Sequence, residues 1–205
     1  MEQVIRLLCL GDSNTYGYDP RSFLGGRYPE EVRWTGILNR LSRWKVVNWG
    51  ENGREIPHFD GDVEDTVDLL SCAKPFDAVL VMLGGNDLLR HPTFTAEDVT
   101  GRMERFLLQL KGHPRVACGR TRVVLLAPVP MVPGQWVGEE RLLVQSARLP
   151  GCYGALARRL EVDFIDTSLW GVEKTFDGVH FSETGHRAFA IGLEKQLEKW
   201  FFPQT

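Results

Sequence analysis

The sequence lacks a strong charge of either sign, long apolar runs and paired cysteines, and each absence argues against a class of protein. The formal net charge of the 205 residues is −3, which provides no electrostatic footprint for nucleic acid or for an anionic membrane. This balance favours a small, mostly neutral molecule as the partner. No segment approaches the roughly 20 apolar residues that a membrane helix requires. The run Val4–Leu10 is also too short for a signal peptide, so we expect a cytoplasmic protein.

The four cysteines are widely scattered, with no CxxC pair and no metal-ligand spacing: Cys9, Cys72, Cys118 and Cys152. We expect free thiols in a reducing compartment, with Cys9 and Cys118 in or near the core. The chain also contains no internal repeat, low-complexity stretch or long linker. It is therefore predicted to form a single domain over residues 1–205, long enough to bury about 70% of its unfolded surface.

Short apolar runs rich in Val, Ile and Leu alternate along the chain with longer segments of helical period. This alternation is typical of a parallel sheet that is covered by helices on both faces. The predicted strands are Val4–Leu10, Lys45–Asn48, Ala78–Leu83, Arg122–Ala127 and Val162–Asp166. Each is followed by polar or glycine-containing residues. Because ligands of open α/β sheets bind outside the carboxyl ends of the strands, the site is predicted at that edge.

The segments between the strands contain helical patterns and two long irregular stretches. The predicted helices are Val32–Trp44, Thr95–Lys111, Glu139–Leu160 and Ser182–Phe201. Thr95 and Asp98 form a capping-box pattern, and Pro150-Gly151 is predicted to break the third helix. Irregular segments as long as Gly17–Glu31 and Pro128–Gly138 are usually functional. Their aromatic and apolar side chains indicate a small apolar opening and a contact between subunits of a homo-oligomer.

A serine, an aspartate and a histidine have the sequence contexts that a hydrolytic triad requires. Ser13 follows the first apolar run at a Gly11-Asp12-Ser13 break, where a strand presents a side chain at the rim of a sheet. A nucleophilic serine needs a base, and the base needs a group that fixes its tautomer. Asp177 and His180, three positions apart on one turn, can supply both. The alternatives are a helix N-cap for Ser13 and a buried, hydrogen-bonded histidine for His180.

Hydrolysis also needs hydrogen-bond donors at the place where negative charge develops on the acyl oxygen. The candidates are the side chain of Asn86 and the backbone N–H groups of Gly53 and Ser13. A glycine at position 53 lets the backbone approach the substrate without a Cβ in the way. Taken singly, Gly53 also fits a plain turn and Asn86 an Asx-turn.

Two further histidines are interpreted differently. His186 falls on the last predicted helix and is expected to be a packing or surface residue. Asp87 and His91 are spaced like a metal pair but have no suitable third ligand, so no metal and no other cofactor is predicted.

Four blocks together resemble the SGNH hydrolases, also called the GDSL esterase/lipase family. In chain order they are Gly11-Asp12-Ser13, Asn48-Trp49-Gly50-Glu51-Asn52-Gly53, Gly84-Gly85-Asn86-Asp87 and Asp177-Gly178-Val179-His180. The resemblance implies that Ser13 is the nucleophile, His180 the base and Asp177 its partner, with Gly53 and Asn86 as oxyanion donors. The fold that it implies is a three-layer α/β/α, flavodoxin-like sandwich whose five parallel strands have the order 2-1-3-4-5.

A closer likeness is to the bacterial arylesterase and acyltransferase branch of this family. It is carried by Ser13-Asn14-Thr15-Tyr16-Gly17-Tyr18, Arg27-Tyr28 and Val32-Arg33-Trp34-Thr35-Gly36. Members of that branch act on short acyl esters, often as oligomers. One departure is Trp49, a bulkier residue than the second block commonly has at this position.

We therefore expect a serine esterase that hydrolyses short-chain, uncharged carboxylic esters through an acyl-enzyme. If the pocket holds an alcohol or peroxide better than water, the same site becomes an acyltransferase. Asp12, Trp34 and Trp136 are expected to contact the substrate. One alternative is a carbohydrate deacetylase with Trp34, Trp49 and Trp136 as stacking faces. Another is a non-catalytic flavodoxin-like module that binds an anion at the Ser13 helix start, although a pure binder has no use for a base and its orienter.

Overall fold

A five-stranded parallel sheet lies at the centre of the molecule. In the computed structural model, which describes residues 3–22, 26–71 and 74–203, the strand order is β2-β1-β3-β4-β5. The strands are β1 (Ile5–Gly11), β2 (Trp44–Gly50), β3 (Ala78–Met82), β4 (Arg122–Leu126) and β5 (Asp163–Ile165). The predicted sheet and strand order are confirmed, and no strand end differs from its predicted position by more than two residues.

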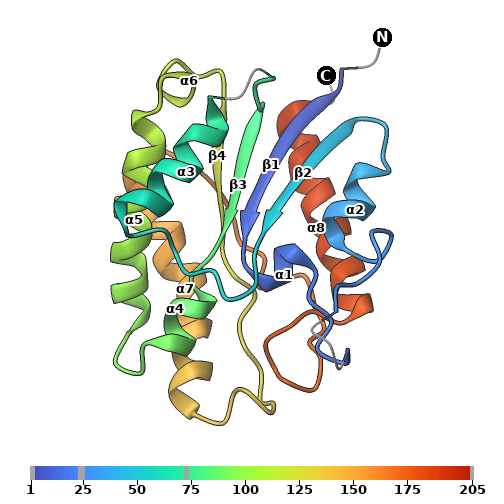
Figure 1. Cartoon of the computed structure of the whole chain (residues 1–205), viewed down its shortest axis with the longest axis vertical. Helices are drawn as coiled ribbons and strands as arrows, with labels where there is room; N and C mark the ends of the chain where they lie inside the picture. Colours follow the sequence, from blue (N-terminus) through green and yellow to red (C-terminus); the bar gives the residue numbers. More distant parts are fainter. Residues whose placement is uncertain (1–2, 23–25, 72–73, 204–205) are drawn as a thin grey trace.

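Helices cover both faces of the sheet (Figure 1). One face carries α2 (Trp34–Asn39) and α8 (Glu183–Phe201). The other carries α3 (Asp60–Leu70), α5 (Ala96–Gly112) and α7 (Glu140–Leu160). The short helices are α1 (Ser13–Tyr16) after β1, α4 (Gly85–Arg90) after β3 and α6 (Pro114–Ala117) before β4. The predicted three-layer α/β/α arrangement is confirmed.

Alternate residues of the central strands enter two separate apolar clusters. In β1, Leu8 and Leu10 belong to the cluster with α5 and α7, whereas Leu7 and Cys9 belong to the cluster with α2 and α8. Successive side chains of a strand point to opposite faces, and here both faces are covered. This explains why the strands are unbroken apolar runs in the sequence.

The helix α7 does not break at Pro150, contrary to the prediction. It runs from Glu140 to Leu160 with this proline inside it. An interior proline costs a helix about 3 kcal/mol because it removes a backbone N–H donor. The neighbouring turns, however, are anchored in the core, since Leu149 and Tyr153 are completely buried and Tyr153 Oη donates a hydrogen bond to a backbone carbonyl of the β3–α4 link. Tertiary packing therefore outweighs the local preference.

The first predicted helix, Val32–Trp44, is too long. The helix α2 ends at Asn39, whose Oδ1 accepts a hydrogen bond from the backbone N–H of Val46 at 3.0 Å. Trp44 is the first residue of β2 and only 2% exposed, so the chain turns early to bring this side chain into the core. The helix α5 follows the prediction and begins with the expected capping box.

The cysteines are free thiols where the structure describes them. Cys9 is buried in β1, as expected, but Cys118 is exposed because it follows α6 at the surface. Cys152 is partly buried, and Cys72 lies outside the described residues. Across the described part of the chain, no helix is long and apolar enough to cross a membrane.

Candidate active site

The carboxyl ends of three neighbouring strands bring three of the sequence blocks together. The strand ends pair in register at Gly11 of β1, Gly50 of β2 and Met82 of β3. Ser13, Gly53 and Asn86 each follow within a few residues, so they meet at one edge of the sheet. The fourth block belongs to the segment between β5 and α8, which reaches the same edge through the contact of His180 with Ser13.

Ser13, His180 and Asp177 form one continuous hydrogen-bonded chain. Ser13 Oγ lies 2.9 Å from His180 Nε2, and His180 Nδ1 lies 2.7 Å from Asp177 Oδ2. All three side chains are buried. An ionised carboxylate only accepts hydrogen bonds, so Nδ1 must carry the proton and Nε2 is free to accept the proton of Ser13. The structure thus brings the three residues of the predicted triad together.

The second carboxylate oxygen of Asp177 is held by its own turn. Oδ1 accepts hydrogen bonds from the backbone N–H groups of Val179 at 2.8 Å and His180 at 2.9 Å, and from the Thr175 hydroxyl at 2.9 Å. Burial alone would raise the pKa of Asp177, but the hydrogen bonds from His180 and the backbone outweigh it and lower this pKa to about 2. The carboxylate is therefore ionised at neutral pH and fixed in its orientation toward the histidine.

Asp12, and not Ser13, is the N-cap of the short helix α1. Its Oδ1 accepts a hydrogen bond from the backbone N–H of Asn14 at 2.9 Å. The hydroxyl of Ser13 is therefore not used as a cap and can face His180. Asp12 is buried, which raises its pKa, and it lines the small hollow of about 20 Å³ beside Ser13 but not the larger catalytic cavity. Asp12 thus supports the backbone of the nucleophile, and its contact with the substrate stays a prediction.

The candidate oxyanion donors face one cavity of about 450 Å³, which Ser13 and His180 also line. Asn86 Nδ2 donates one hydrogen bond to the carbonyl of Arg54 at 3.0 Å, which orients the amide and leaves its second N–H for an anion. Gly53 has a φ of 74°, where a Cβ would lie 2.6 Å from Arg90 Nη2. The N–H of Ser13 is in the first turn of α1 and has no acceptor within the helix.

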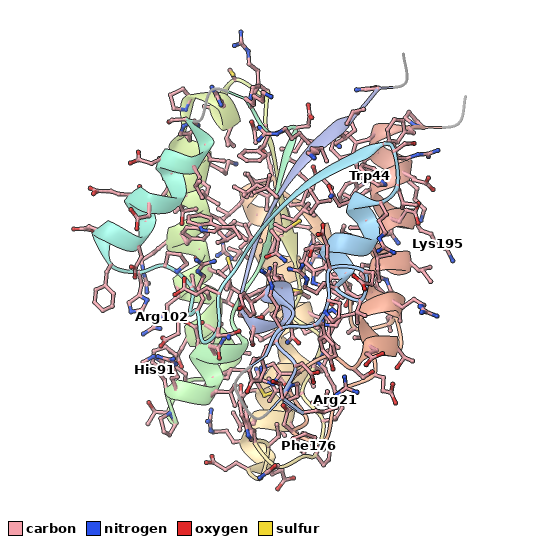
Figure 2. All side chains as sticks on the ribbon, turned by 45° about the vertical axis from the view of Figure 1, so that its right-hand side comes forward. Arg21, Trp44, His91, Arg102, Phe176 and Lys195 are labelled. Atoms are coloured by element: carbon pink, nitrogen blue, oxygen red, sulfur yellow. The ribbon has the colours of Figure 1, made fainter. Side chains whose placement is uncertain are left out.

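A partly buried ion-pair network links the two segments that carry Gly53 and Asn86. Asp87 accepts hydrogen bonds from the backbone N–H of Ile56 at 3.1 Å and from Arg102 at 3.0 Å. The same guanidinium donates to Glu55 at 2.8 Å, and His91 Nε2 lies 2.7 Å from that carboxylate. Figure 2 shows Arg102 and His91 close together. Arg102 of α5 thus joins α4 to the segment after β2. Its positive charge lies between Asp87 and His91 and disfavours a metal ion at this pair.

Comparison with known proteins agrees with this geometry. Residues 9–188 match the model of the GDSL-like lipase/acylhydrolase family. The chain belongs to this family. The resemblance recognised from the four sequence blocks is therefore confirmed, and the protein is an ester-hydrolysing serine hydrolase. No curated protein sequence matches this acylhydrolase significantly.

Several solved structures share the fold of the acylhydrolase. An aryl esterase from M. smegmatis is 27% identical, with a TM-score of 0.81 and coverage of 96% of this chain and 99% of that chain. A carbohydrate acetylesterase from Sinorhizobium meliloti is 25% identical, with a TM-score of 0.83 and coverage of 96% and 100%. A carbohydrate acetylesterase family member from the same organism is 28% identical, with a TM-score of 0.81 and coverage of 95% and 98%.

Two aromatic side chains narrow the catalytic cavity of the acylhydrolase. The rings of Tyr18 and Trp136 lie 4.7 Å and 5.0 Å from the ring of His180, and Trp136 meets it edge-on at 82°. The backbone N–H of Trp136 donates a hydrogen bond to the carbonyl of Asp177 at 3.0 Å. The segment Pro128–Gly138 thus packs against the catalytic turn and holds Trp136, which is 48% exposed, at the cavity.

Trp34 does not contact the catalytic cavity, so this prediction is wrong. Its side chain is completely buried, because α2 turns this face toward the sheet and α8, and its ring packs 5.1 Å from that of Phe189. Its Nε1 donates a hydrogen bond to the carbonyl of Asn14 at 3.0 Å. Trp49 is partly buried, with the guanidinium of Arg54 4.9 Å from its ring centre. Of the three predicted stacking faces, Trp136 alone lines the catalytic cavity.

His186 is a packing residue, one of the two roles expected for it. It is only 1% exposed, and its ring lies 5.2 Å from that of Tyr28 and 5.4 Å from that of Phe181. Burial lowers the pKa of His186 to about 3. The imidazole is therefore neutral in the folded protein at physiological pH.

Two polar residues near the nucleophile were not anticipated from the sequence. Asn14 accepts a hydrogen bond from the backbone N–H of Phe181 at 2.9 Å and donates one to the carbonyl of Val179 at 3.3 Å. Lys174 donates to the same carbonyl at 3.0 Å, and burial lowers the pKa of this lysine to about 7. Through these hydrogen bonds both side chains hold the turn Asp177–His180 in position. Adjacency to Ser13 was a signal for Asn14, whereas Lys174 stands in no motif.

Proposed function

We propose that this acylhydrolase is a serine esterase that hydrolyses small, uncharged esters of short carboxylic acids through an acyl-enzyme. Ser13 is the nucleophile, His180 the base and Asp177 the group that orients the base. The observation that carries the proposal is the hydrogen-bonded chain of 2.9 Å from Ser13 to His180 and 2.7 Å from His180 to Asp177. Nucleophilic catalysis by a serine requires this geometry.

Acylation begins when neutral His180 takes the hydroxyl proton of Ser13 on Nε2 while Oγ attacks the carbonyl carbon. Asp177 stays ionised and stabilises the resulting imidazolium through Nδ1–H. The electron pair of the carbonyl bond moves to the oxygen, where the N–H groups of Ser13 and Gly53 and the side chain of Asn86 stabilise the negative charge. Backbone N–H groups and an amide oriented by its own hydrogen bond need little reorganisation in the transition state.

The intermediate collapses when His180 returns its proton to the leaving alcohol and the bond from the acyl carbon to that oxygen breaks. Water then gives a proton to His180 and attacks the acyl group. The bond from the acyl carbon to Ser13 Oγ breaks as His180 returns the proton to Oγ, which releases the acid and restores Ser13. An alcohol or a peroxide in the place of water would give a new ester or a peracid by the same steps. Adding a short alcohol and measuring the ratio of new ester to free acid tests this acyltransferase activity.

The space around the nucleophile supports a short acyl chain. The cavity beside Ser13 has a volume of only about 450 Å³, and Tyr18 and Trp136 narrow it beside His180. The smaller hollow that Ser13 also lines has about 20 Å³, which is room for roughly one water molecule. An acetyl to butyryl group therefore fits this site better than a fatty acyl chain.

The nucleophile can be tested directly with a fluorophosphonate probe. We expect one label on the wild type and none on Ser13→Ala, together with loss of 4-nitrophenyl acetate hydrolysis. Thermal unfolding of the variant should resemble that of the wild type. Labelling or hydrolysis that survives in the folded variant would refute the assignment of Ser13.

A second candidate is the deacetylation of acetylated sugars by the same residues. It is favoured by the two carbohydrate acetylesterase structures from Sinorhizobium meliloti among the neighbours. The half-exposed ring of Trp136 at the cavity is a further supporting feature. The two candidates share every chemical step and differ in the alcohol that leaves.

A further inference from the structure

A second cavity opens beside the catalytic one. Its volume is about 350 Å³, and it is lined by the predicted stacking residue Trp49 at the end of β2, by the segment after β2 and by the first turns of α3. It shares Asn52, Gly53 and Arg90 with the catalytic cavity, so the two cavities meet at the candidate oxyanion donor Gly53. The reaction steps described above make no use of this space.

The glycine at position 53 leaves room for the guanidinium of Arg90 where the two cavities meet. A Cβ there would lie 2.6 Å from Arg90 Nη2, and the φ of 74° is one that side-chain-bearing residues rarely adopt. An ester whose carbonyl oxygen is bound at this donor therefore lies at the junction. One of its two arms can occupy the catalytic cavity while the other extends into the second cavity.

The polar lining of the second cavity combines free carboxylates with guanidinium and amide donors. Asp62 and Asp65, three positions apart on α3 and both exposed, have no ion-pair partner in the described part of the chain. Arg54 and Arg90 also line the cavity, and their guanidinium groups lie 2.7 Å and 3.8 Å from glutamate oxygens. Asn52 adds an amide.

An exposed aromatic ring completes the lining. Phe59 is 67% exposed although it is a large apolar residue, and it stands at the N-cap of α3. Its ring packs 4.2 Å from that of His58, which also lines the cavity. An aromatic face beside carboxylates and amides can cover the apolar face of a ring whose edges carry polar groups.

We propose that this second cavity binds the alcohol part of the ester, and that this alcohol is a neutral, polyhydroxylated ring such as a sugar. The proposal rests on the serine esterase function proposed above. Hydroxyl groups both donate and accept hydrogen bonds, so they suit this mixed lining. A cationic alcohol would be repelled by Arg90 at the junction, whereas an anionic alcohol would be repelled by Asp62 and Asp65.

Three acetate esters separate binding of the alcohol from the chemistry of the acyl group. Ethyl acetate and methyl 6-O-acetylglucopyranoside transfer the same acetyl group from similar alkyl alcohols, and 4-nitrophenyl acetate reports the basal activity. For the wild type we expect kcat/KM for the sugar acetate to exceed that for ethyl acetate at least about tenfold. Two or more additional hydrogen bonds account for a factor of this size.

Variants of the cavity lining show where this preference arises. The double variant Asp62→Asn/Asp65→Asn, and separately Phe59→Ala, should raise KM for the sugar acetate about tenfold. Both should leave 4-nitrophenyl acetate and ethyl acetate within about twofold of the wild type. The matched control is Asp68→Asn, an exposed carboxylate of the same helix that does not line the cavity, which should change none of the three activities.

The other outcomes are distinguishable. A wild type without preference for the sugar acetate, or a double variant that slows all three esters alike, overturns the alcohol site but leaves the esterase function intact. Hydrolysis of 4-nitrophenyl acetate by Ser13→Ala refutes the function itself. If acetylcholine is preferred over the sugar acetate and the double variant abolishes that preference, the cavity binds a cation and the neutral alcohol is refuted.

Discussion

The two oxygens of the Asp177 carboxylate have separate tasks. Oδ2 faces His180 Nδ1, while Oδ1 is held by the backbone of the turn and by the Thr175 hydroxyl. Because the pKa of Asp177 is lowered to about 2, it keeps its charge at every pH at which an ester hydrolase is normally assayed. Asp177 therefore supplies both the negative charge beside His180 and the hydrogen bond that orients its ring.

At the residue scale, the substitution Asp177→Asn tests the two tasks of this carboxylate. An asparagine can turn an N–H toward Nδ1 of His180, which favours the wrong tautomer of the base, so we expect kcat to fall about 10³- to 10⁴-fold. KM should change little, because the side chain is buried behind the histidine. Steady-state kinetics on 4-nitrophenyl acetate provide both numbers. A raised KM with an unchanged kcat would instead place residue 177 in substrate binding.

At the scale of secondary-structure elements, Arg102 connects three of them. Its side chain is only 12% exposed, and it contacts the buried carboxylate of Asp87 on α4 and Glu55 in the segment after β2. Removal of one partner of such a pair leaves an uncompensated buried charge, which is costly. Two of the three candidate oxyanion donors, Gly53 and Asn86, are carried by the segments that this arginine joins.

We expect Arg102→Ala to lower the free energy of unfolding by about 3 kcal/mol, since Asp87 is left buried and unpaired. It should also lower kcat, because α4 and the Gly53 segment lose their common anchor. Urea unfolding and steady-state kinetics measure the two effects. The control is Arg105→Ala, an exposed arginine of the same helix, which should change the stability by less than about 0.5 kcal/mol. Equal effects of the two substitutions would contradict the role of the network.

The segment Pro128–Gly138 sets one wall of the catalytic cavity through Trp136. Each added CH₂ that finds a pocket should gain about 0.8 kcal/mol of binding until the cavity is full. On 4-nitrophenyl esters we expect kcat/KM to be highest from acetate to butyrate and to fall steeply by octanoate. Trp136→Ala should move the optimum to longer chains and raise the octanoate-to-butyrate ratio about tenfold.

Val132→Ala is the matched control, because Val132 lies in the same segment and is 41% exposed but does not line the cavity. It should leave the chain-length profile unchanged. A wild type that prefers palmitate to butyrate would refute the short-acyl proposal without affecting the serine chemistry.

The strands and the candidate catalytic residues were predictable because each leaves a local signal in the sequence. A strand covered on both faces must be continuously apolar, and a nucleophile needs a base and an orienter of specific residue types. Helix bounds were less predictable, since the early end of α2 and the continuity of α7 through Pro150 depend on side chains that are distant in the sequence. Burial of Trp34 and the contacts of Lys174 depend in the same way on the assembled fold.

At the scale of the whole molecule, stability in acid depends on His186, a histidine outside the reaction. Burial lowers its pKa from 6.5 to about 3 in the folded protein. Between these values the unfolded chain binds a proton that the folded protein excludes, so stability falls as the pH falls through this window. The stability that Asp177 contributes is fully present above its ordinary pKa of 3.8 and is lost only as the pH falls toward about 2.

We expect His186→Gln to flatten the acid side of the stability profile. Between pH 6.5 and 4.5 a single excluded proton makes the free energy of unfolding fall by up to about 1.4 kcal/mol per pH unit, and a glutamine removes this contribution. Urea unfolding at intervals of half a pH unit measures the slope for both proteins. The control Phe189→Leu, a packing substitution in the neighbouring apolar cluster, should lower the stability by a similar amount at every pH and keep the slope of the wild type. If His186→Gln also keeps that slope, the acid sensitivity arises elsewhere, and the buried imidazole is a neutral packing group without thermodynamic coupling to pH.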